Sequence, residues 1–380
     1  MKIEKEIHEK YINIAIKLAE KARGKTSPNP MVGAVLVKNG KIIGEGYHKR
    51  KGTNHAEVEA INSCQSSLGG AIMYVTLEPC CFYGNTPPCT KSILKAGIKK
   101  VIVGIIDPNP KVNGRGIKEL KREGVDVEFG FLEKEISKQN ETYIKYITKK
   151  IPFVTMKIAI SLDGKMCTKT GDSKWISSDI SRKYVHKKRS QYDSVLTGIG
   201  TVLTDDPLLT SRYGKNRKNP IRIIVDSKLK IPLNSKVLKT IDEARLIIAT
   251  TKYHNEEKAN EIKRLGGEIL VVKNHIKYKK QKNKDQYYRV NLHKLLEMLG
   301  EMEVTSVLVE AGSTLSTSFI KQNLVDKFLV FIAPIIIGGN ESFQTIGDLG
   351  IEKIMDVNRV NIFNLERMGD DILIEAYPYK

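Results

Sequence analysis

The strongest constraint on the fold is a regular alternation of helical and strand patterns over the first 150 residues. Two apolar runs flank Asn39-Gly40 within residues 31–48, which is typical of a β-hairpin. Helices are expected over 4–23, from near His55, and over 89–99, 116–124 and 132–150, and strands over 71–79, 100–107 and 125–129. A hairpin followed by repeated α and β units predicts a mostly parallel sheet covered by helices.

The pattern restarts at Ile151-Pro152, where FVTMKIAISLDGK begins a second strand-led module. A chain of 380 residues is also too long for one ordinary core. We therefore expect two α/β domains, residues 1–150 and 151–380, with the boundary near 148–152. Further strands are expected at 193–198, 221–226, 246–250, 268–272, 306–310, 328–333 and 373–377. No G-x-G-x-x-G follows a strand, so a Rossmann domain is not expected.

Hydrophobicity and cysteine usage indicate the cellular compartment in which the protein is expected. The longest apolar run, FLVFIAPIII (328–337), is shorter than the ~18 residues of a membrane span, and the N-terminal segment is charged. Five cysteines, an odd number and mostly clustered, favour thiolate chemistry in a reducing compartment over disulfides. We expect a cytoplasmic protein that has no membrane partner.

The net charge of +20 raises the question of an anionic partner. Lysine is spread along the whole chain, and the one dense run lies at 273–289. This run is expected to be a solvated loop or linker-like insertion, with a nucleic-acid patch as the less favoured reading. We expect no nucleic-acid partner, and a general attraction for phosphorylated substrates.

Three of the five cysteines, Cys80, Cys81 and Cys89, lie in LEPCCFYGNTPPC (77–89). Upstream, NHAEVEA (54–60) places His55 and Glu57 two positions apart. A His-x-Glu followed by Pro-Cys and a further Cys is the signature of zinc deaminases that act on nucleobase-like amines. The spacing departs from that signature, which has Pro-Cys-x-x-Cys.

The chemistry of a zinc deaminase explains each of these residue types. One imidazole and two thiolates offset the charge of Zn²⁺ and leave one position for water, whose pKa falls towards ~7. Glu57 suits a proton shuttle. Cys80 and Cys89 are expected at helix N-termini, where thiolates are favoured. Cys81 competes with Cys80 as the ligand, and Cys80 is favoured because it directly follows Pro79.

Two alternatives use the same residues. One is a deaminase of tRNA or another nucleic acid with an accessory domain, which the separate second domain disfavours. The other is a zinc-stabilised scaffold with a fourth protein ligand and no metal-bound water. The position of Glu57, two residues from His55, argues against the scaffold.

Longer stretches of the chain resemble a known family. The riboflavin-biosynthesis deaminase is similar to TSPNPMVGAVLV (26–37), GEGYHKRKGTNHAEVEA (44–60), YVTLEPCCFYGNTPPC (74–89) and DPNPKVNGRGI (107–117). The reductase fused to it is similar to MKIAISLDGKMCTKTGDSKWIS (156–177), VLTGIGTVLTDDPLLTSR (195–212) and VLVEAGSTLSTSF (307–319). These stretches also follow one another in the same order as in the family. The chain therefore resembles the bifunctional RibD/RibG family over essentially its whole length.

This resemblance implies a cytidine-deaminase-like three-layer α/β/α domain followed by a dihydrofolate-reductase-like α/β domain. The first would be a zinc-dependent hydrolase that removes the 2-amino group of diaminohydroxyphosphoribosylaminopyrimidine. The second would be an oxidoreductase that uses NADPH to reduce the ribosyl side chain to ribityl. The partners would be small phosphorylated pyrimidines, and a homo-oligomer is compatible with the family.

The resemblance also assigns roles to residues. For the deaminase it implies zinc ligation by His55, Cys80 and Cys89, proton transfer by Glu57, and substrate contacts by Asn29, His48, Asp107 and Asn109. For the reductase it implies substrate contacts by Ser173, Arg189, Leu209, Arg212 and Glu310. Cofactor contacts are implied for Ala159, Trp175, Thr201, Asp205, Ser227, Gly312, Ser313 and Thr314.

Some of these residues also have a plainer local reading. A single tryptophan such as Trp175 is usually a core residue. If the family resemblance is set aside, Arg189 and Arg212 are interpreted as ordinary surface charges. Gly312-Ser313-Thr314 lies between a strand and a helix, so its amides suit an anion such as a pyrophosphate. A left-handed φ at Gly312 explains the glycine equally well.

The deaminase half departs from the family at three positions. The family usually has Ser-His where this chain has Cys81-Phe82, and a basic residue where it has Asn85. These departures affect the expected grip on the substrate phosphate and leave the zinc chemistry intact. Lys49, Arg50 or Lys51 is the hypothesised replacement.

Overall fold

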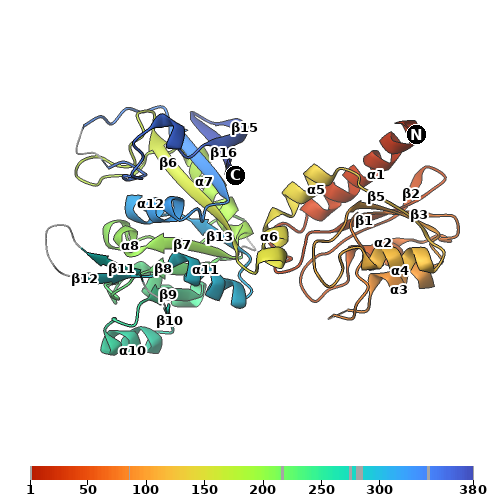
Figure 1. The fold of residues 1–380 in the computed structure, drawn as a ribbon, viewed down its shortest axis with the longest axis horizontal. Coiled ribbons are helices and arrows are strands. Elements are labelled where there is room, and N and C mark those ends of the chain that lie inside the picture. Colours follow the sequence, from red (N-terminus) through yellow and green to blue (C-terminus); the bar gives the residue numbers. More distant parts are fainter. Residues whose placement is uncertain are drawn as a thin grey trace. The chain divides into compact units, whose positions relative to one another are not determined.

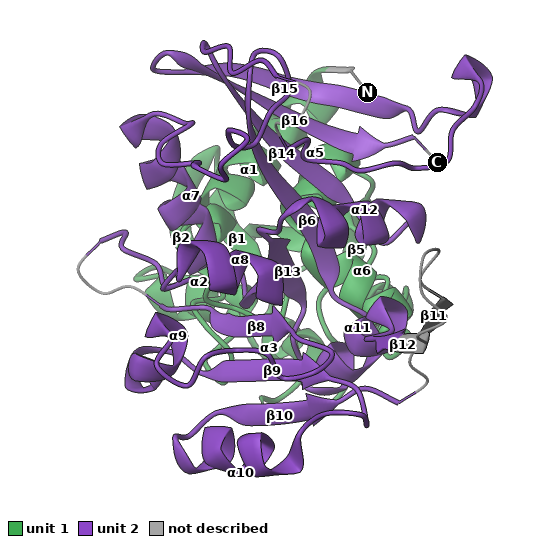
Figure 2. Cartoon of the chain, turned by 90° about the vertical axis from the view of Figure 1, so that its left-hand side faces the viewer, with its two compact units in different colours: residues 1–150 green, residues 151–380 purple. Residues whose placement is uncertain are grey.

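The computed structural model describes residues 2–84, 86–214, 218–273, 276–279, 286–339 and 343–379. The chain divides into two compact units, residues 1–150 and 151–380 (Figure 2). Each unit has a sheet and a hydrophobic core of its own. Within the described residues, the helices are too short or too polar to cross a bilayer.

The first unit is built on a five-stranded sheet in the order β2-β1-β3-β4-β5. Its strands are β1 (Gly33–Lys38), β2 (Lys41–Tyr47), β3 (Ile72–Leu77), β4 (Lys100–Ile105) and β5 (Asp126–Phe129). Its helices are α1 (Lys2–Glu20), α2 (Ala56–Ser63), α3 (Cys89–Lys95), α4 (Arg115–Arg122), α5 (Glu133–Gln139) and α6 (Glu141–Lys149).

The expected hairpin and parallel strands are both present in this sheet. β1 and β2 pair in antiparallel fashion through Asn39 (φ 51°) and Gly40 (φ 72°), a pair of left-handed residues that a two-residue turn requires. β3, β4 and β5 are parallel. Helices α1 and α5 cover one face, and α2, α3 and α4 cover the other (Figure 1). The result is a sheet covered by helices, as the element order predicts, in the three-layer arrangement that the resemblance implies.

The single helix predicted over 132–150 is wrong, because the segment forms two helices that meet at Asn140. Asn140 is 1% exposed. Its Oδ1 accepts a hydrogen bond from the Met31 amide at 2.8 Å, and its Nδ2 donates to the Met31 carbonyl at 3.0 Å. The inward side chain thus satisfies a buried peptide group far away in the sequence, and the helix breaks there.

The second unit contains a nine-stranded sheet among its described residues, in the order β10-β9-β8-β7-β13-β6-β14-β16-β15. The strands are β6 (Phe153–Ser161), β7 (Ser194–Gly198), β8 (Ile221–Val225), β9 (Leu246–Thr250), β10 (Glu268–Val271), β13 (Ser306–Val309), β14 (Lys327–Ala333), β15 (Val360–Met368) and β16 (Asp371–Pro378). The helices are α7 (Asp179–Gln191), α8 (Ile199–Asp205), α9 (Lys236–Lys239), α10 (Glu256–Arg264), α11 (Leu292–Glu301) and α12 (Ser313–Lys321), with short 3₁₀ turns at Ile241–Glu243 and Ile354–Asp356.

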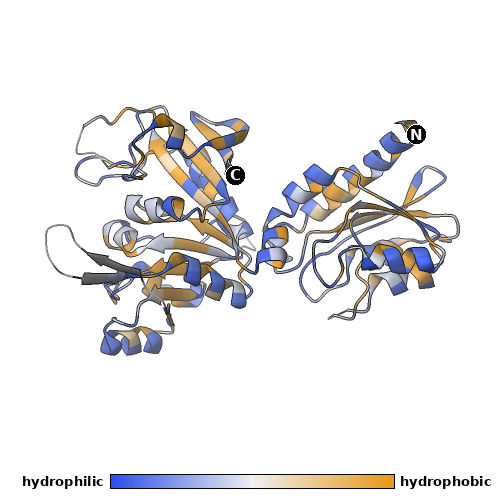
Figure 3. Ribbon diagram, in the orientation of Figure 1, coloured by the Kyte–Doolittle hydropathy of each residue, from blue (hydrophilic) through white to orange (hydrophobic). Residues whose placement is uncertain are grey.

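The seven strands β10, β9, β8, β7, β13, β6 and β14 run parallel, and β16 and β15 add two antiparallel strands at one edge. Leucines of α11 and Phe319 of α12 pack on one face of this sheet. Val185 of α7 and Ile262 of α10 belong to the core on the other face. Figure 3 shows hydrophobic residues concentrated on the strands and on the helix faces that turn toward them.

Two parts of this unit differ from the sequence expectation. The basic stretch 273–289, expected as a solvated loop, contains the antiparallel strands β11 (Ile276–Lys279) and β12 (Gln286–Arg289), although residues 274, 275 and 280–285 lie outside the described part. β15 was not expected either. Most of its residues are exposed or half-buried, so the sequence lacks the alternation that marks a strand.

We expect Asn140→Ala to destabilise the first unit by about 2–4 kcal/mol, because it leaves two buried backbone groups of Met31 without partners. Urea unfolding, with amide hydrogen exchange to assign the loss to the first unit, measures the effect. Lys149→Ala, an exposed site on α6, is the control and should change stability by less than about 0.5 kcal/mol. An equal effect of the two substitutions would contradict the role given to Asn140.

Candidate active sites

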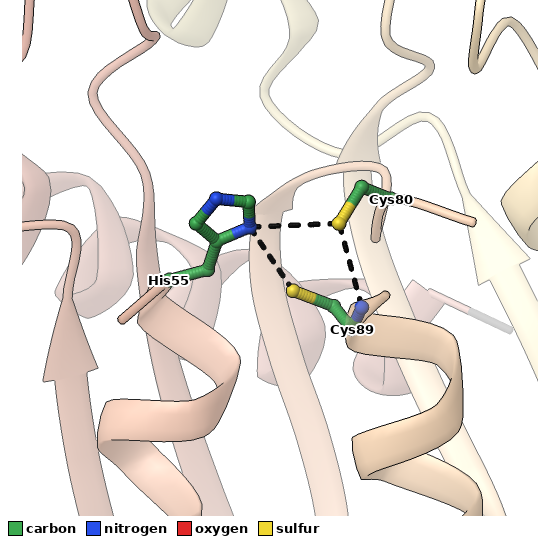
Figure 4. Close-up of side chains that lie close together, drawn as sticks. All are labelled: His55, Cys80 and Cys89. Atoms are coloured by element: carbon green, nitrogen blue, oxygen red, sulfur yellow. Dashed lines mark hydrogen bonds between the residues drawn. The ribbon is translucent and has the colours of Figure 1, made fainter. Parts of the chain in front are cut away.

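Three potential metal ligands converge beyond the carboxyl end of β3. His55 precedes the first residue of α2, Cys80 lies in the loop after β3, and Cys89 is the first residue of α3. His55 Nδ1 lies 3.2 Å from Cys89 Sγ and 3.5 Å from Cys80 Sγ. Figure 4 shows the imidazole nitrogen turned toward both sulfurs.

This geometry fits zinc. Tetrahedral bonds to one nitrogen and two sulfurs separate N from S by about 3.5 Å, which agrees with both distances. All three ligand atoms lie within 4.8 Å of one another. Thr86 Oγ1 lies 3.4 Å from His55 Nε2, so it contacts the second ring nitrogen and helps to orient the ring. The donor set matches a three-ligand site.

Cys80 rather than Cys81 faces the histidine. The Cys81 thiol points away and donates to the Lys111 carbonyl at 4.0 Å. The expected position of Cys80 at a helix N-terminus is wrong, since it lies in a loop. Its sulfur nevertheless accepts a hydrogen bond from the first amide of α3, that of Cys89, at 3.4 Å. Hydrogen bonds from Cys89 and His55 lower the pKa of the Cys80 thiol, which favours the thiolate form that a zinc ligand needs.

Glu57 lies beside these ligands on the first turn of α2 and is 3% exposed. Burial raises the pKa of Glu57 to about 7, against the opposing effect of His55. The carboxyl group also hydrogen-bonds with Cys89. Because its pKa is close to neutrality, Glu57 is able both to take up and to release a proton.

Asn29 and His48 meet next to this group. Asn29 Nδ2 donates to His48 Nε2 at 3.1 Å, so His48 Nδ1 carries the proton and donates to the Asn54 carbonyl at 3.1 Å. The rings of His48 and His55 lie 5.3 Å apart between centroids. Burial lowers the pKa of His48, which favours its neutral form. The two residues therefore form a polar, uncharged patch beside the metal ligands.

Asp107 and Asn109 follow β4 and are held by residues that the sequence analysis missed. Asp107 accepts hydrogen bonds from Tyr143 Oη at 2.9 and 3.1 Å, and burial raises its pKa to about 6. Glu78 accepts the backbone amides of Asp107, Gly114 and Ile117 at 3.2, 2.8 and 3.1 Å. The signal for Glu78 was present, because it is an acidic residue directly after a buried strand.

The cations expected to bind the substrate phosphate in this unit are less clearly placed than the metal ligands. Lys49 Nζ forms an ion pair with Glu59 at 2.5 Å, so its charge is already neutralised. The Phe82 ring lies 5.7 Å from Lys111 Nζ, which places a cation over an aromatic face where the family usually has histidine. Asn85 lies outside the described residues.

The second unit contains a cavity of about 750 Å³ at the carboxyl ends of β7, β8 and β13. Of the residues expected to contact cofactor or substrate, Ser173, Thr201, Asp205, Ser227, Gly312, Ser313 and Thr314 line it. Gly312 has φ −70°, so the alternative of a left-handed glycine is wrong, and it directly precedes α12. The start of α12 therefore lines the cavity, and the N-terminus of a helix suits an anion.

Ala159 and Trp175 are not part of the cavity lining. Trp175 is 66% exposed, with the Arg182 guanidinium 4.5 Å from its ring, so a role as a core residue is excluded. Leu209, expected to contact substrate, is 2% exposed and packs in the hydrophobic core. The structure therefore gathers most, but not all, of the expected cofactor residues around one cavity.

Glu310 forms the charged centre of this unit. It follows β13, and Arg189 Nε and Nη2 donate to its two oxygens at 2.6 and 2.9 Å. Burial alone would raise the pKa of Glu310, but the charges of Arg189 and Lys157 hold it at about 2. Lys157 on β6 was missed by the sequence analysis, although a lysine inside an apolar strand is itself a signal. Burial lowers its pKa.

Arg212 extends this cationic group toward solvent. Its Nε and Nη2 lie 3.2 and 2.9 Å from His186 Nε2. Burial and the two neighbouring arginines lower the pKa of His186 to about 4, so the neutral ring accepts these bonds. Arg189 and Arg212 are thus both fixed by partners, as a site for an anionic substrate requires.

Glu4, His8 and Glu128 form a second group whose ligand atoms lie within 4.8 Å of one another. However, Lys100 Nζ lies 2.6 Å from Glu128 and 3.2 Å from Asp126. Because this ammonium group already pairs with Glu128, a metal ion would have to displace it. We regard the group as an ion-pair network.

Both units match known protein families. Residues 5–105 match the cytidine and deoxycytidylate deaminase zinc-binding region, and residues 152–374 match the RibD C-terminal domain. A riboflavin biosynthesis protein RibD of Aquifex aeolicus is 43% identical over 370 residues, which cover 97% of this chain and 98% of that protein. These matches confirm the expected order of a deaminase domain and a reductase domain.

Solved structures agree over the same length. Acinetobacter baumannii RibD is 32% identical, with a TM-score of 0.86 and coverage of 99% of this chain and 100% of that one. A Thermotoga maritima diaminohydroxyphosphoribosylaminopyrimidine deaminase/5-amino-6-(5-phosphoribosylamino)uracil reductase is 35% identical, with a TM-score of 0.83 and the same coverage. The chain therefore belongs to the RibD family, whose members join a deaminase to a reductase in riboflavin biosynthesis.

Proposed function

We propose that the first unit hydrolyses the 2-amino group of diaminohydroxyphosphoribosylaminopyrimidine and that the second reduces the ribosyl side chain of the product to ribityl with NADPH. The observation that carries the first half is the convergence of His55, Cys80 and Cys89 beside the buried Glu57. For the second half it is the cavity at the start of α12, next to the Arg189–Glu310 pair. The name of the Thermotoga maritima relative supports this substrate and this order of reactions.

In the deaminase, zinc bound by His55, Cys80 and Cys89 would supply an activated water at neutral pH. Glu57 would carry these protons one at a time: it would pass the first from the water to the ring nitrogen, and the second from the added hydroxyl group to the amino group that leaves as ammonia. Asn29 and His48 offer amide and imidazole groups to the edge of the pyrimidine. Asp107 and Asn109, held in place by Glu78, would bind the ribose hydroxyls or an amino group.

In the reductase, bound NADPH would supply a hydride to the sugar carbon. Glu310 stays ionised through its pairing with Arg189, so it stabilises positive charge that develops on the sugar. Arg212 and the cationic surroundings of Glu310 suit the phosphate of the substrate. Trp175, Thr201, Asp205 and the start of α12 would hold the cofactor.

The two active sites should fail separately. In a coupled assay with the diaminopyrimidine nucleotide, Glu57→Gln should lower ammonia release at least ~100-fold, because it removes the proton carrier. NADPH oxidation with the deaminated intermediate should stay unchanged. Glu310→Gln should show the opposite pattern. Loss of both activities in either variant would contradict the assignment of one reaction to each unit.

Zinc content tests the ligand set independently of activity. Cys80→Ser and Cys89→Ser should each reduce bound zinc well below about one ion per chain, measured by mass spectrometry of the metal after gel filtration. Cys81→Ser is the matched control and should retain zinc, because its thiol faces Lys111 instead. Equal zinc loss in all three variants would overturn the distinction between Cys80 and Cys81.

The pH profile of the reductase tests the Arg189–Glu310 pair. With a pKa of about 2, Glu310 remains ionised from pH 5 to pH 8 in the parent chain. In Arg189→Gln, burial is no longer offset by the arginine, so the pKa of Glu310 rises above its usual value of about 4.3. NADPH oxidation by this variant should therefore fall as the pH is lowered from 7 to 5, relative to its own maximum.

Arg212→Gln serves as the control for that profile. It removes a nearby cation without breaking the bidentate pair, so its activity should show no added loss between pH 7 and pH 5. A parallel profile for both variants would show that Arg189 does not govern the ionisation of Glu310.

A further inference from the structure

The buried hydroxyl of Tyr143 contacts two residues that are expected to bind the deaminase substrate. Tyr143 belongs to the first turn of α6 and is 6% exposed. Its Oη lies 2.9 Å from Asp107 Oδ1 and 3.1 Å from Asp107 Oδ2, so both oxygens of the carboxylate share the hydroxyl proton. The same hydroxyl hydrogen-bonds with the side chain of Asn109. One hydroxyl group of α6 thus fixes both polar side chains of the loop after β4.

This hydroxyl donates to a carboxylate. Burial and the charge of Asp107 hold the pKa of Tyr143 well above its usual value, so the phenol keeps its proton. Burial raises the pKa of Asp107 to about 6, and the hydrogen bonds from the Asn109 amide, at 2.9 Å, and from Tyr143 oppose that rise. The charges of Glu78 and Cys80 act in the same direction as burial. The Tyr143 hydroxyl therefore favours the ionised form of Asp107 and fixes the plane of its carboxylate.

The packing of the fold requires the ring of Tyr143 but not its hydroxyl. The ring belongs to the hydrophobic core of the first unit. A phenylalanine would fill the same volume, whereas a buried hydroxyl and a buried carboxylate are each unfavourable unless they are hydrogen-bonded. Replacement of both partners of such a buried hydrogen bond by apolar groups of the same shape can be nearly neutral for stability. A polar pair that packing does not require points to a role in binding.

The start of α6 also holds a second loop of the deaminase site. Asn140, which precedes α6, binds the amide and the carbonyl of Met31 at 2.8 and 3.0 Å, and Met31 lies two residues after Asn29. Asn140 and Tyr143 are three residues apart, so they lie on the same side of the helix. The first turn of α6 thus braces the loop of Asn29 and the loop of Asp107, which come from distant parts of the sequence.

We propose that Tyr143 is a positioning residue of the deaminase and that its hydroxyl holds Asp107 and Asn109 in the orientation that binds the ribose hydroxyls of the substrate. This inference rests on the proposed deaminase function. It goes beyond that function because it assigns part of the affinity for the ribose to a residue of α6 that acts through the two loop residues. A carboxylate fixed in advance binds more tightly, since less conformational freedom is lost on binding.

The test uses the full-length protein and measures ammonia release from the diaminopyrimidine nucleotide. In Tyr143→Phe the Asp107 carboxylate loses a buried donor, so KM should rise about 5- to 20-fold. The value of kcat should change less than about 3-fold, because the ribose is bound alike in the ground state and in the transition state at the ring. A fall in kcat at unchanged KM would overturn the inference.

Tyr11→Phe is the matched control. Tyr11 is also 6% exposed, and its hydroxyl donates to the Gly40 carbonyl at 2.8 Å, in the turn between β1 and β2. This substitution also removes a hydrogen bond of a buried tyrosine but should leave KM and kcat unchanged. Bound zinc and the thermal unfolding midpoint should be alike in the two variants. Loss of zinc in Tyr143→Phe alone, or an equal rise of KM in both variants, would show a structural role and refute the inference.

A double-substitution cycle shows whether Tyr143 acts through Asp107. Asp107→Asn should itself raise KM, because it removes the charge that accepts the ribose hydroxyls. In that background Tyr143→Phe should raise KM by less than about 2-fold more, since the group that it orients is already impaired. Effects that multiply would sink the inference while the deaminase assignment stands. If the parent chain releases no ammonia from the nucleotide, the proposed deaminase function itself fails, and this inference fails with it.

Discussion

A buried carboxylate that follows a parallel strand organises each of the two sites. An ionised carboxylate inside a protein is strongly unfavourable unless it is paired and hydrogen-bonded. Glu78, after β3, obtains three backbone amides from the segment 107–117, and so joins the loop of Cys80 to the loop of Asp107. Gly116 permits this approach, since a Cβ there would lie 2.1 Å from the Pro79 carbonyl. Glu310, after β13, obtains Arg189 from α7.

The same constraint explains why both sites lie where parallel strands end. In open α/β sheets the loops at the carboxyl ends of the strands bring helix N-termini and polar side chains together. In the first unit these loops carry Cys80 and Asp107, α2 begins directly after His55, and α3 begins at Cys89. In the second unit the loops after β7, β8 and β13 line the cavity. The deaminase site and the reductase site thus both lie at the carboxyl ends of parallel strands, although their chemistries are unrelated.

Local chemistry made part of this arrangement predictable from the sequence. His55, Glu57 and Cys80 stand in short motifs whose spacing is set by zinc chemistry, and the hairpin at Asn39-Gly40 follows from backbone sterics. The break at Asn140 was not predictable, because its cause is a peptide group of Met31 distant in sequence. Lys157 did carry a signal, a lysine inside an apolar strand, but the sequence does not show that Glu310, whose charge acts on it, follows a different strand. The hairpin of β11 and β12 shows sheet pairing in a stretch whose charge favours a loop.

The net charge of +20 can attract an anionic ligand to a site mainly through the cations that lie near that site. At physiological ionic strength, exposed charges more than about 8 Å apart are largely screened. Lys49 is paired with Glu59, and Lys100 with Asp126 and Glu128, so these lysines add little to any long-range field. A zinc ion held by one imidazole and two thiolates would give a nearly neutral centre, which suits a neutral pyrimidine ring. In the reductase, Lys228 and Lys230 line the cavity and have no carboxylate partner among the described residues, which suits the phosphates of the proposed substrate and cofactor. The contrast between the two sites therefore follows from where carboxylates are present to neutralise lysine and arginine.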